Sequence, residues 1–295
     1  MATRTTRRSQ ENGLFIKHLK GNYSLARSYW LHTVLLGWGL SALAAYVFHR
    51  IGEGHAARHV SMAVLVFQPL ATLVWLWSTL GTWVAAMKHL FIKGSRLWAV
   101  LVMMALIAGV FGVMRELTSM RPYLQEHWEV AQGKQPTDDG FTVSLQDNGR
   151  VVEFKGGVNE GAAAALDKAI ADAPKVSTIR LDSPGGWLRE GERMAQVVRR
   201  YQLHTHVDED CYSSCTLVFL AGQDRTAGAH AAVGFHRGRG IGEGKRGGSA
   251  RSDEAELYAK AGLDVAFVRR ILNTPNDEIW VPTRRELLKA RVLTR

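Results

Sequence analysis

Several patterns that mark common classes of binding protein are missing from these 295 residues. There is no Walker-type loop, and the glycine-rich stretch 238–252 does not follow a strand and open a helix, as a dinucleotide-binding fingerprint would. No internal repeat is found. His204 and His206 alternate with Asp208 on one predicted strand, but two histidines without a clear third and fourth ligand do not make a zinc site. We therefore expect no cofactor and no bound metal.

Charged residues are missing from three long apolar segments in the first half of the chain. Residues 30–48, 62–87 and 97–114 contain no Lys, Arg, Asp or Glu. Helices of about this length cross a hydrocarbon core of about 30 Å. None of the three has the polar face that a helix of a soluble bundle turns toward water. The sequence therefore predicts a membrane domain of three transmembrane helices over residues 30–115, with the lipid bilayer as a partner.

The distribution of Lys and Arg predicts how these helices are oriented. Residues 1–29 carry six Lys and Arg, the loop 49–61 carries two and the loop 88–96 carries three. Positive flanks stay in the cytoplasm, so residues 1–29 are predicted as a basic cytoplasmic segment and everything after residue 115 as extracytoplasmic, at the periplasmic face of the inner membrane. Much of the net charge of +10 lies in these flanks, and we expect no nucleic-acid partner.

A cleaved signal peptide is not expected, because 29 mostly polar residues precede the first apolar segment and no small-residue cleavage site follows a single short apolar core. Residues 116–140 are polar and rich in turn formers, and we interpret them as a stalk.

The pattern changes again at residue 141. An Asp-Asn-Gly turn separates two alternating stretches within residues 141–154, which predicts a hairpin. Helical and strand patterns then alternate as far as residue 222, with strands predicted around 176–183 and 204–210. The fold class we predict is α/β, with transmembrane helices followed by a domain of βαβ units over residues 141–295.

Three short motifs lie where predicted strands end. In CYSSC, residues 211–215, a serine would sit at the start of an apolar helix, where free backbone N–H groups favour an oxyanion; the alternative is an ordinary helix cap. In SPGG, residues 183–186, two glycines let backbone N–H groups approach a ligand, although plain turns contain them too. GFHR, residues 234–237, offers a histidine as a general base or as a structural strand residue.

In order and spacing, the three motifs resemble the proteolytic subunit of the Clp protease and, more broadly, the crotonase fold that signal peptide peptidases share. The resemblance covers roughly residues 141–295. It implies Ser213 as the nucleophile and His236, 23 residues later, as the base. It also implies that the backbone N–H groups of Gly186 and Ser214 form the oxyanion hole.

The third catalytic residue is less well defined by the resemblance. The acid of the family corresponds to the segment TPNDEIWVPT, where Asp277 and Glu278 are the nearest carboxylates, and Asp277 is our prediction. Signal peptide peptidases use a Ser and Lys pair instead, which would assign the base to Lys260. That lysine lies on what is predicted to be a solvated helix face, so we rank it below His236.

The function implied is that of a membrane-anchored serine endopeptidase, which cleaves peptides or unfolded proteins at the outer face of the inner membrane. The alternative is a catalytically inactive binding or scaffold protein of the same fold. An acyl-CoA enzyme is disfavoured, because we identify no adenine-nucleotide pocket and an extracytoplasmic domain meets no coenzyme A. Family members often assemble into rings, so a homo-oligomer is expected from the resemblance.

Cys211 and Cys215, the only cysteines, flank Ser213. In an oxidising compartment an even pair this close is a candidate disulfide, since a strand-to-helix turn brings Cα atoms four residues apart within the roughly 4.4 to 6.8 Å that a bridge allows. The alternative is two buried thiols with no bond between them. A disulfide would fix the turn that presents Ser213 and make activity sensitive to reduction.

Overall fold

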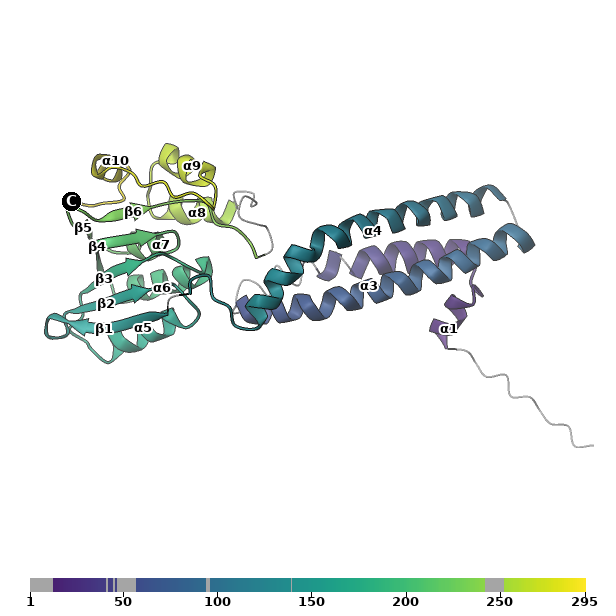
Figure 1. The fold of residues 1–295 in the computed structure, drawn as a ribbon, viewed down its shortest axis with the longest axis horizontal. Coiled ribbons are helices and arrows are strands. Elements are labelled where there is room, and N and C mark those ends of the chain that lie inside the picture. Colours follow the sequence, from purple (N-terminus) through teal and green to yellow (C-terminus); the bar gives the residue numbers. More distant parts are fainter. Residues whose placement is uncertain are drawn as a thin grey trace, which may run out of the picture. The chain divides into compact units, whose positions relative to one another are not determined.

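The computed structural model describes residues 13–40, 42–44, 46, 57–93, 96–138, 140–241 and 252–295. The chain divides into two compact units, Met1–Trp128 and Glu129–Arg295 (Figure 1). The first unit is helical and the second is a mixed α/β unit, so the predicted change of architecture along the chain is present.

The first unit contains α1 (Leu14–Leu19), a π-helix η1 (Arg27–Trp38), α3 (Ala57–Lys88), a second π-helix η2 (His89–Lys93) and most of α4 (Arg96–Ala131). Two stretches, Ala57–Ile92 and Arg96–Thr118, are helical, long and apolar enough to cross a membrane. In the most apolar window of each stretch, only 11% and 17%, respectively, is buried within the protein. The core helix of a soluble domain would be mostly buried.

Other parts of the predicted membrane domain are less completely described. The first predicted segment, 30–48, lies partly outside the described residues, as does the loop 49–61, while residues 1–12 lie wholly outside them. The described part of the basic segment is helical in places: His18 of α1 is buried, and its Nε2 lies 3.1 Å from the carbonyl oxygen of Ser78 in α3. Residues 13–29 therefore pack as part of the first unit rather than forming only a polar tail.

The segment 116–140, predicted as a stalk, has two parts in the structure. Helix α4 continues to Ala131, so the first part of the segment 116–140 is helical. Beyond the helix, Gln135 accepts hydrogen bonds from the Trp187 indole (3.0 Å) and from the backbone N–H of Glu160 (3.1 Å). These contacts attach the end of the segment to the α/β unit, so residue 135 does not belong to a free linker.

The second unit is built on one sheet of six strands. They are β1 (Phe141–Gln146), β2 (Val151–Gly156), β3 (Thr178–Ser183), β4 (His204–Tyr212), β5 (Arg225–Ala227) and β6 (Ala232–Gly234). The order is β1-β2-β3-β4-β5, and β6 pairs with the end of β4. The first pair is antiparallel around the short 3₁₀ turn η3 (Asp147–Gly149), and all other pairs are parallel. This confirms the hairpin and the α/β class.

The helices of this unit are α5 (Ala162–Ala171), α6 (Leu188–Arg200), α7 (Cys215–Leu220), α8 (Ser252–Lys260), α9 (Val265–Asn273) and α10 (Arg284–Lys289). Strands β2, β3 and the first part of β4 alternate buried residues with more exposed ones, and they contribute Phe154, Leu181 and Val207 to the core that these helices share. The polar positions between them carry ion pairs such as Arg180 with Asp208, 2.9 Å apart.

Candidate active site

The three predicted motifs meet at one edge of the sheet. Strands β3, β4 and β6 run parallel and end at Ser183, Tyr212 and Gly234. In the register, Ser183 pairs with Cys211 and Tyr212 pairs with Gly234. The carboxyl ends of parallel strands are the usual place for a ligand site in an α/β fold, and here they bring together the segments 183–186, 211–215 and 234–237.

Ser213 occupies a strained turn between β4 and α7. Its φ is +55°, in the left-handed region that residues other than glycine rarely adopt. The turn is held on both sides, because the Ser213 N–H donates to the Gly234 carbonyl (3.0 Å) and the Ser213 carbonyl accepts from the Thr216 N–H (2.9 Å) and hydroxyl (2.7 Å). A strained strand-to-helix turn of this kind presents a nucleophilic serine outward in hydrolases.

Ser214, the neighbouring serine, has a different environment. It is 2% exposed, and its hydroxyl oxygen is buried without a hydrogen-bond partner. Its Cβ packs beside Gly191 of α6, where an added Cβ would lie 3.0 Å from it. The hydroxyl of Ser214 is therefore enclosed in the core, whereas Ser213 is half-buried at the edge of the sheet.

The glycine pair of the first motif passes directly beside Ser213. Gly185 has φ +92°, and a Cβ there would lie 2.7 Å from the Cβ of Ser213. A Cβ on Gly186 would lie 2.4 Å from the carbonyl oxygen of Val158, whose own N–H donates to the Gly185 carbonyl (2.8 Å). A side chain on Gly185 would clash with Ser213, and one on Gly186 would clash with Val158, so both positions require glycine.

Two backbone donors are available at this edge. Within the described part of the chain, neither the Gly186 N–H nor the Ser214 N–H donates a hydrogen bond to a protein acceptor. Ser214 immediately precedes α7, and the first N–H groups of a helix have no acceptor within it. These are the two groups that the resemblance to the Clp protease implies for an oxyanion hole.

His236 follows β6 and is 8% exposed. Loss of hydration on burial lowers the pKa of its imidazole below the usual 6.5, which favours the neutral ring. Among the described residues, its side chain makes no hydrogen bond to Ser213. Such contacts are often long in ligand-free sites and tighten when substrate binds.

The side chain of Asn276, one residue before the predicted Asp277, contacts His236. The Asn276 Nδ2 lies 3.0 Å from the His236 Nδ1, and the same nitrogen donates to the Arg237 carbonyl (3.1 Å). The resemblance implies a carboxylate at this place, so it does not predict Asn276, which lies in the same TPNDE segment. The Arg237 N–H donates to the Thr274 carbonyl (3.0 Å), which ties this segment to the end of β6.

Other candidates have ordinary surroundings. The Lys260 side chain is 70% exposed and pairs with Glu256 one helical turn away (2.8 Å), which is the solvated helix face expected for it. His206 contacts Thr226 (2.7 Å) and Asp208 (2.9 Å) on the polar face of the sheet. The glycine-rich stretch 238–252 lies largely outside the described residues.

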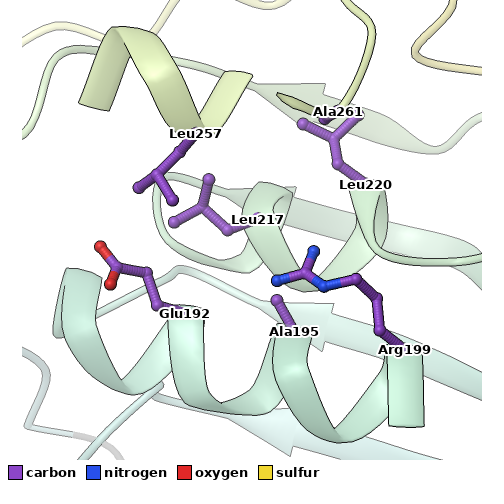
Figure 2. Close-up of a pocket in the computed structure, with 7 residues that line it drawn as sticks. All are labelled: Glu192, Ala195, Arg199, Leu217, Leu220, Leu257 and Ala261. Atoms are coloured by element: carbon purple, nitrogen blue, oxygen red, sulfur yellow. The ribbon is translucent and has the colours of Figure 1, made fainter. Parts of the chain in front are cut away.

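A separate depression lies between α6, α7 and α8 (Figure 2). Its empty volume is about 290 Å³, part of which is open to solvent. None of the predicted site residues lines it. Leucine side chains form part of it, and Glu192 and Arg199 of α6 stand beside them, as Figure 2 shows. The candidate active site is therefore at the sheet edge and not in this depression.

Cys211 and Cys215 form a disulfide in the structure, with Cα atoms 5.4 Å apart. Both residues are fully buried, and the bond closes the turn that contains Ser213. Because disulfides persist in oxidising compartments, the bond is consistent with an extracytoplasmic position of this unit.

The disulfide and the orientation can be tested together in intact cells. If free thiols are blocked before lysis, we expect the peptide containing residues 211–215 to carry no label until it is reduced and two labels afterwards, as measured by mass spectrometry. A periplasm-dependent reporter fused after Arg295 serves as the topology control and should be active. A peptide that is fully labelled before reduction, together with an inactive reporter, would contradict both the bond and the orientation.

The sequence matches no protein-family model, and no curated protein matches it. Among solved structures, one match is a point mutant of ClpP1 from Listeria monocytogenes. It is 16% identical in sequence, covers 49% of this chain and 89% of that chain, and has a TM-score of 0.39. At 16% identity the match assigns no roles to individual residues of this chain.

Proposed function

We propose that the chain is a membrane-anchored serine hydrolase that cleaves peptide bonds. The observation that carries the proposal is the turn at Ser213, whose left-handed backbone places the residue beside Gly185 and next to two unpartnered N–H groups. His236, buried and favoured in its neutral form, follows the strand that pairs with this turn. The residues proposed as nucleophile, base and oxyanion donors lie at one sheet edge, which supports the proposal.

The reaction follows from these positions. The Ser213 oxygen attacks the substrate carbonyl carbon, while its proton passes to His236. The N–H groups of Gly186 and Ser214 stabilise the oxyanion that forms. His236 then returns the proton to the leaving amine. In the second half of the reaction, water attacks the acyl-enzyme while His236 takes its proton, and His236 returns this proton to the Ser213 oxygen as the acid product leaves.

The membrane anchor determines where this reaction takes place. The stretches Ala57–Ile92 and Arg96–Thr118 are the best-supported spans, and the sequence adds a third at 30–48. With the positive flanks in the cytoplasm, the α/β unit lies at the outer face of the inner membrane. Peptides or unfolded proteins in that compartment are the proposed substrates. The proposed active form is a homo-oligomer.

A catalytically inactive binding or scaffold protein is the second candidate. The contact of the Asn276 amide nitrogen with the His236 Nδ1 favours it, because a donor at Nδ1 leaves the proton of a neutral ring on Nε2. In that tautomer the ring has no free nitrogen to accept the serine proton.

Labelling with a fluorophosphonate separates the two candidates. We expect the purified full-length protein in detergent to take up one equivalent of probe and Ser213→Ala to take up none, because only an activated serine is phosphonylated. The matched control is Ser214→Ala, which removes the enclosed neighbouring hydroxyl and should still label. If the folded wild-type protein does not react, the scaffold function is favoured.

A further inference from the structure

The orientation of the Asn276 side-chain amide is fixed by the Arg237 carbonyl. The Arg237 carbonyl, 3.1 Å from Nδ2, can only accept a hydrogen bond, so the NH₂ group of the amide must face it. The same NH₂ group lies 3.0 Å from the His236 Nδ1. With one N–H directed to each partner, Nδ1 is the acceptor. Turning the amide over would set its oxygen against the Arg237 carbonyl oxygen, which is unfavourable.

This orientation determines the tautomer of His236. A neutral imidazole carries one proton, and if Nδ1 accepts a hydrogen bond then the proton is on Nε2. A general base for Ser213 needs the opposite arrangement, with Nε2 free and a proton on Nδ1 that an acceptor holds. The resting site therefore has its histidine in the wrong tautomer for proton abstraction.

We propose that Asn276 is the positioning residue of His236 and holds the ring with its proton on Nε2, so that the base becomes competent only when the amide turns over or leaves Nδ1. The inference rests on the proposed function, since it assigns the regulation of the same site. The exchange has three parts: the Nδ2 contacts with Arg237 and His236 are lost, the ring releases its Nε2 proton to water and takes one up from water at Nδ1, and the amide oxygen then accepts from Nδ1–H.

The tautomer can be measured without any reference to activity. Solid-state NMR of the full-length chain labelled with ¹⁵N-histidine distinguishes a protonated from an unprotonated ring nitrogen, and His236→Gln identifies the resonances of this residue. We expect an unprotonated Nδ1 and a protonated Nε2 in the wild-type protein. A protonated Nδ1 at neutral pH would overturn the proposal, whether or not the protein reacts with the fluorophosphonate.

Asn276→Asp provides the functional test. A carboxylate accepts from Nδ1–H and cannot donate, so it favours the competent tautomer and stabilises the imidazolium. We expect the labelling rate at neutral pH to rise at least about tenfold. We also expect the acid limb of the pH–rate profile to move to higher pH by roughly one pH unit or more, because the carboxylate raises the pKa of the imidazole. A residue that merely supports the fold would leave this limb in place.

Asn273→Asp is the matched control, because it makes the same exchange at an exposed asparagine at the end of α9. We expect its pH–rate profile to follow the wild-type profile. If Asp277→Asn lowers the rate strongly while Asn276→Asp leaves the limb unmoved, Asp277 is the orienting residue and the proposal for Asn276 is wrong. If the NMR shows the expected tautomer and no variant labels, the positioning role stands and the hydrolase function fails.

Discussion

His236→Ala is expected to lower the second-order rate of fluorophosphonate labelling by about 10²- to 10⁴-fold, the range that a positioned general base contributes. Without the imidazole, the Ser213 hydroxyl has no group to take its proton, while the backbone donors at Gly186 and Ser214 stay in place. Hydrolysis of an unstructured peptide should fall by a similar factor.

Lys260→Ala is the control for this prediction. Lys260 is the other base that the sequence offers, and it lies exposed beside Glu256. Its replacement should leave the rate unchanged. A wild-type rate in His236→Ala with a loss in Lys260→Ala would reverse the assignment and indicate a Ser and Lys mechanism.

The pH dependence of the wild-type rate has a definite sign. The base works in its neutral form, and burial lowers the pKa of His236 below 6.5. Activity should therefore persist into more acidic solution than an exposed histidine would allow. The same shift affects stability: the unfolded chain binds a proton near pH 6.5 and the folded chain only below it, so His236 destabilises the fold progressively as the pH falls through that range.

The sequence predicts the α/β unit well because its signals are local. The alternation of buried and polar residues in β2 and β3 has the period of a strand, and the Asp-Asn-Gly turn at 147–149 matches the hairpin. The motifs at 183–186, 211–215 and 234–237 each begin at the last residues of a strand, and parallel strands bring such segments to one edge.

The contacts that the sequence does not predict depend on tertiary structure. Nothing local in TPNDE distinguishes Asn276 from Asp277, because the choice depends on which side chain the turn after α9 directs toward His236. Likewise, polar residues after 116 look like a stalk, although α4 continues through them to Ala131. The attachment of Gln135 to Trp187, 52 residues later, has no signal in either segment.

Gly185→Ala is expected to lower the labelling rate at least about 100-fold through the oxyanion hole. An added Cβ would lie 2.6 Å from the carbonyl oxygen of Tyr212 and 2.7 Å from the Cβ of Ser213. Because one of these atoms belongs to the backbone, residues 185–187 must move away from Ser213, and the Gly186 N–H moves with them. Loss of one oxyanion donor costs about 10²- to 10³-fold in kcat.

Gly161→Ala separates this contact from the cost of the backbone conformation. Gly161 has φ +93°, nearly equal to the +92° of Gly185, but nothing lies within 4 Å of an added Cβ. Both variants pay about 1 to 2 kcal/mol for a left-handed alanine, whereas only Gly185→Ala meets the clash. Thermal unfolding and fluorophosphonate labelling should be measured on both. We expect Gly161→Ala to melt a few degrees lower and to label at the wild-type rate. If folded Gly185→Ala also labels at that rate, the glycine pair does not position an oxyanion donor, and Ser213 must use other groups.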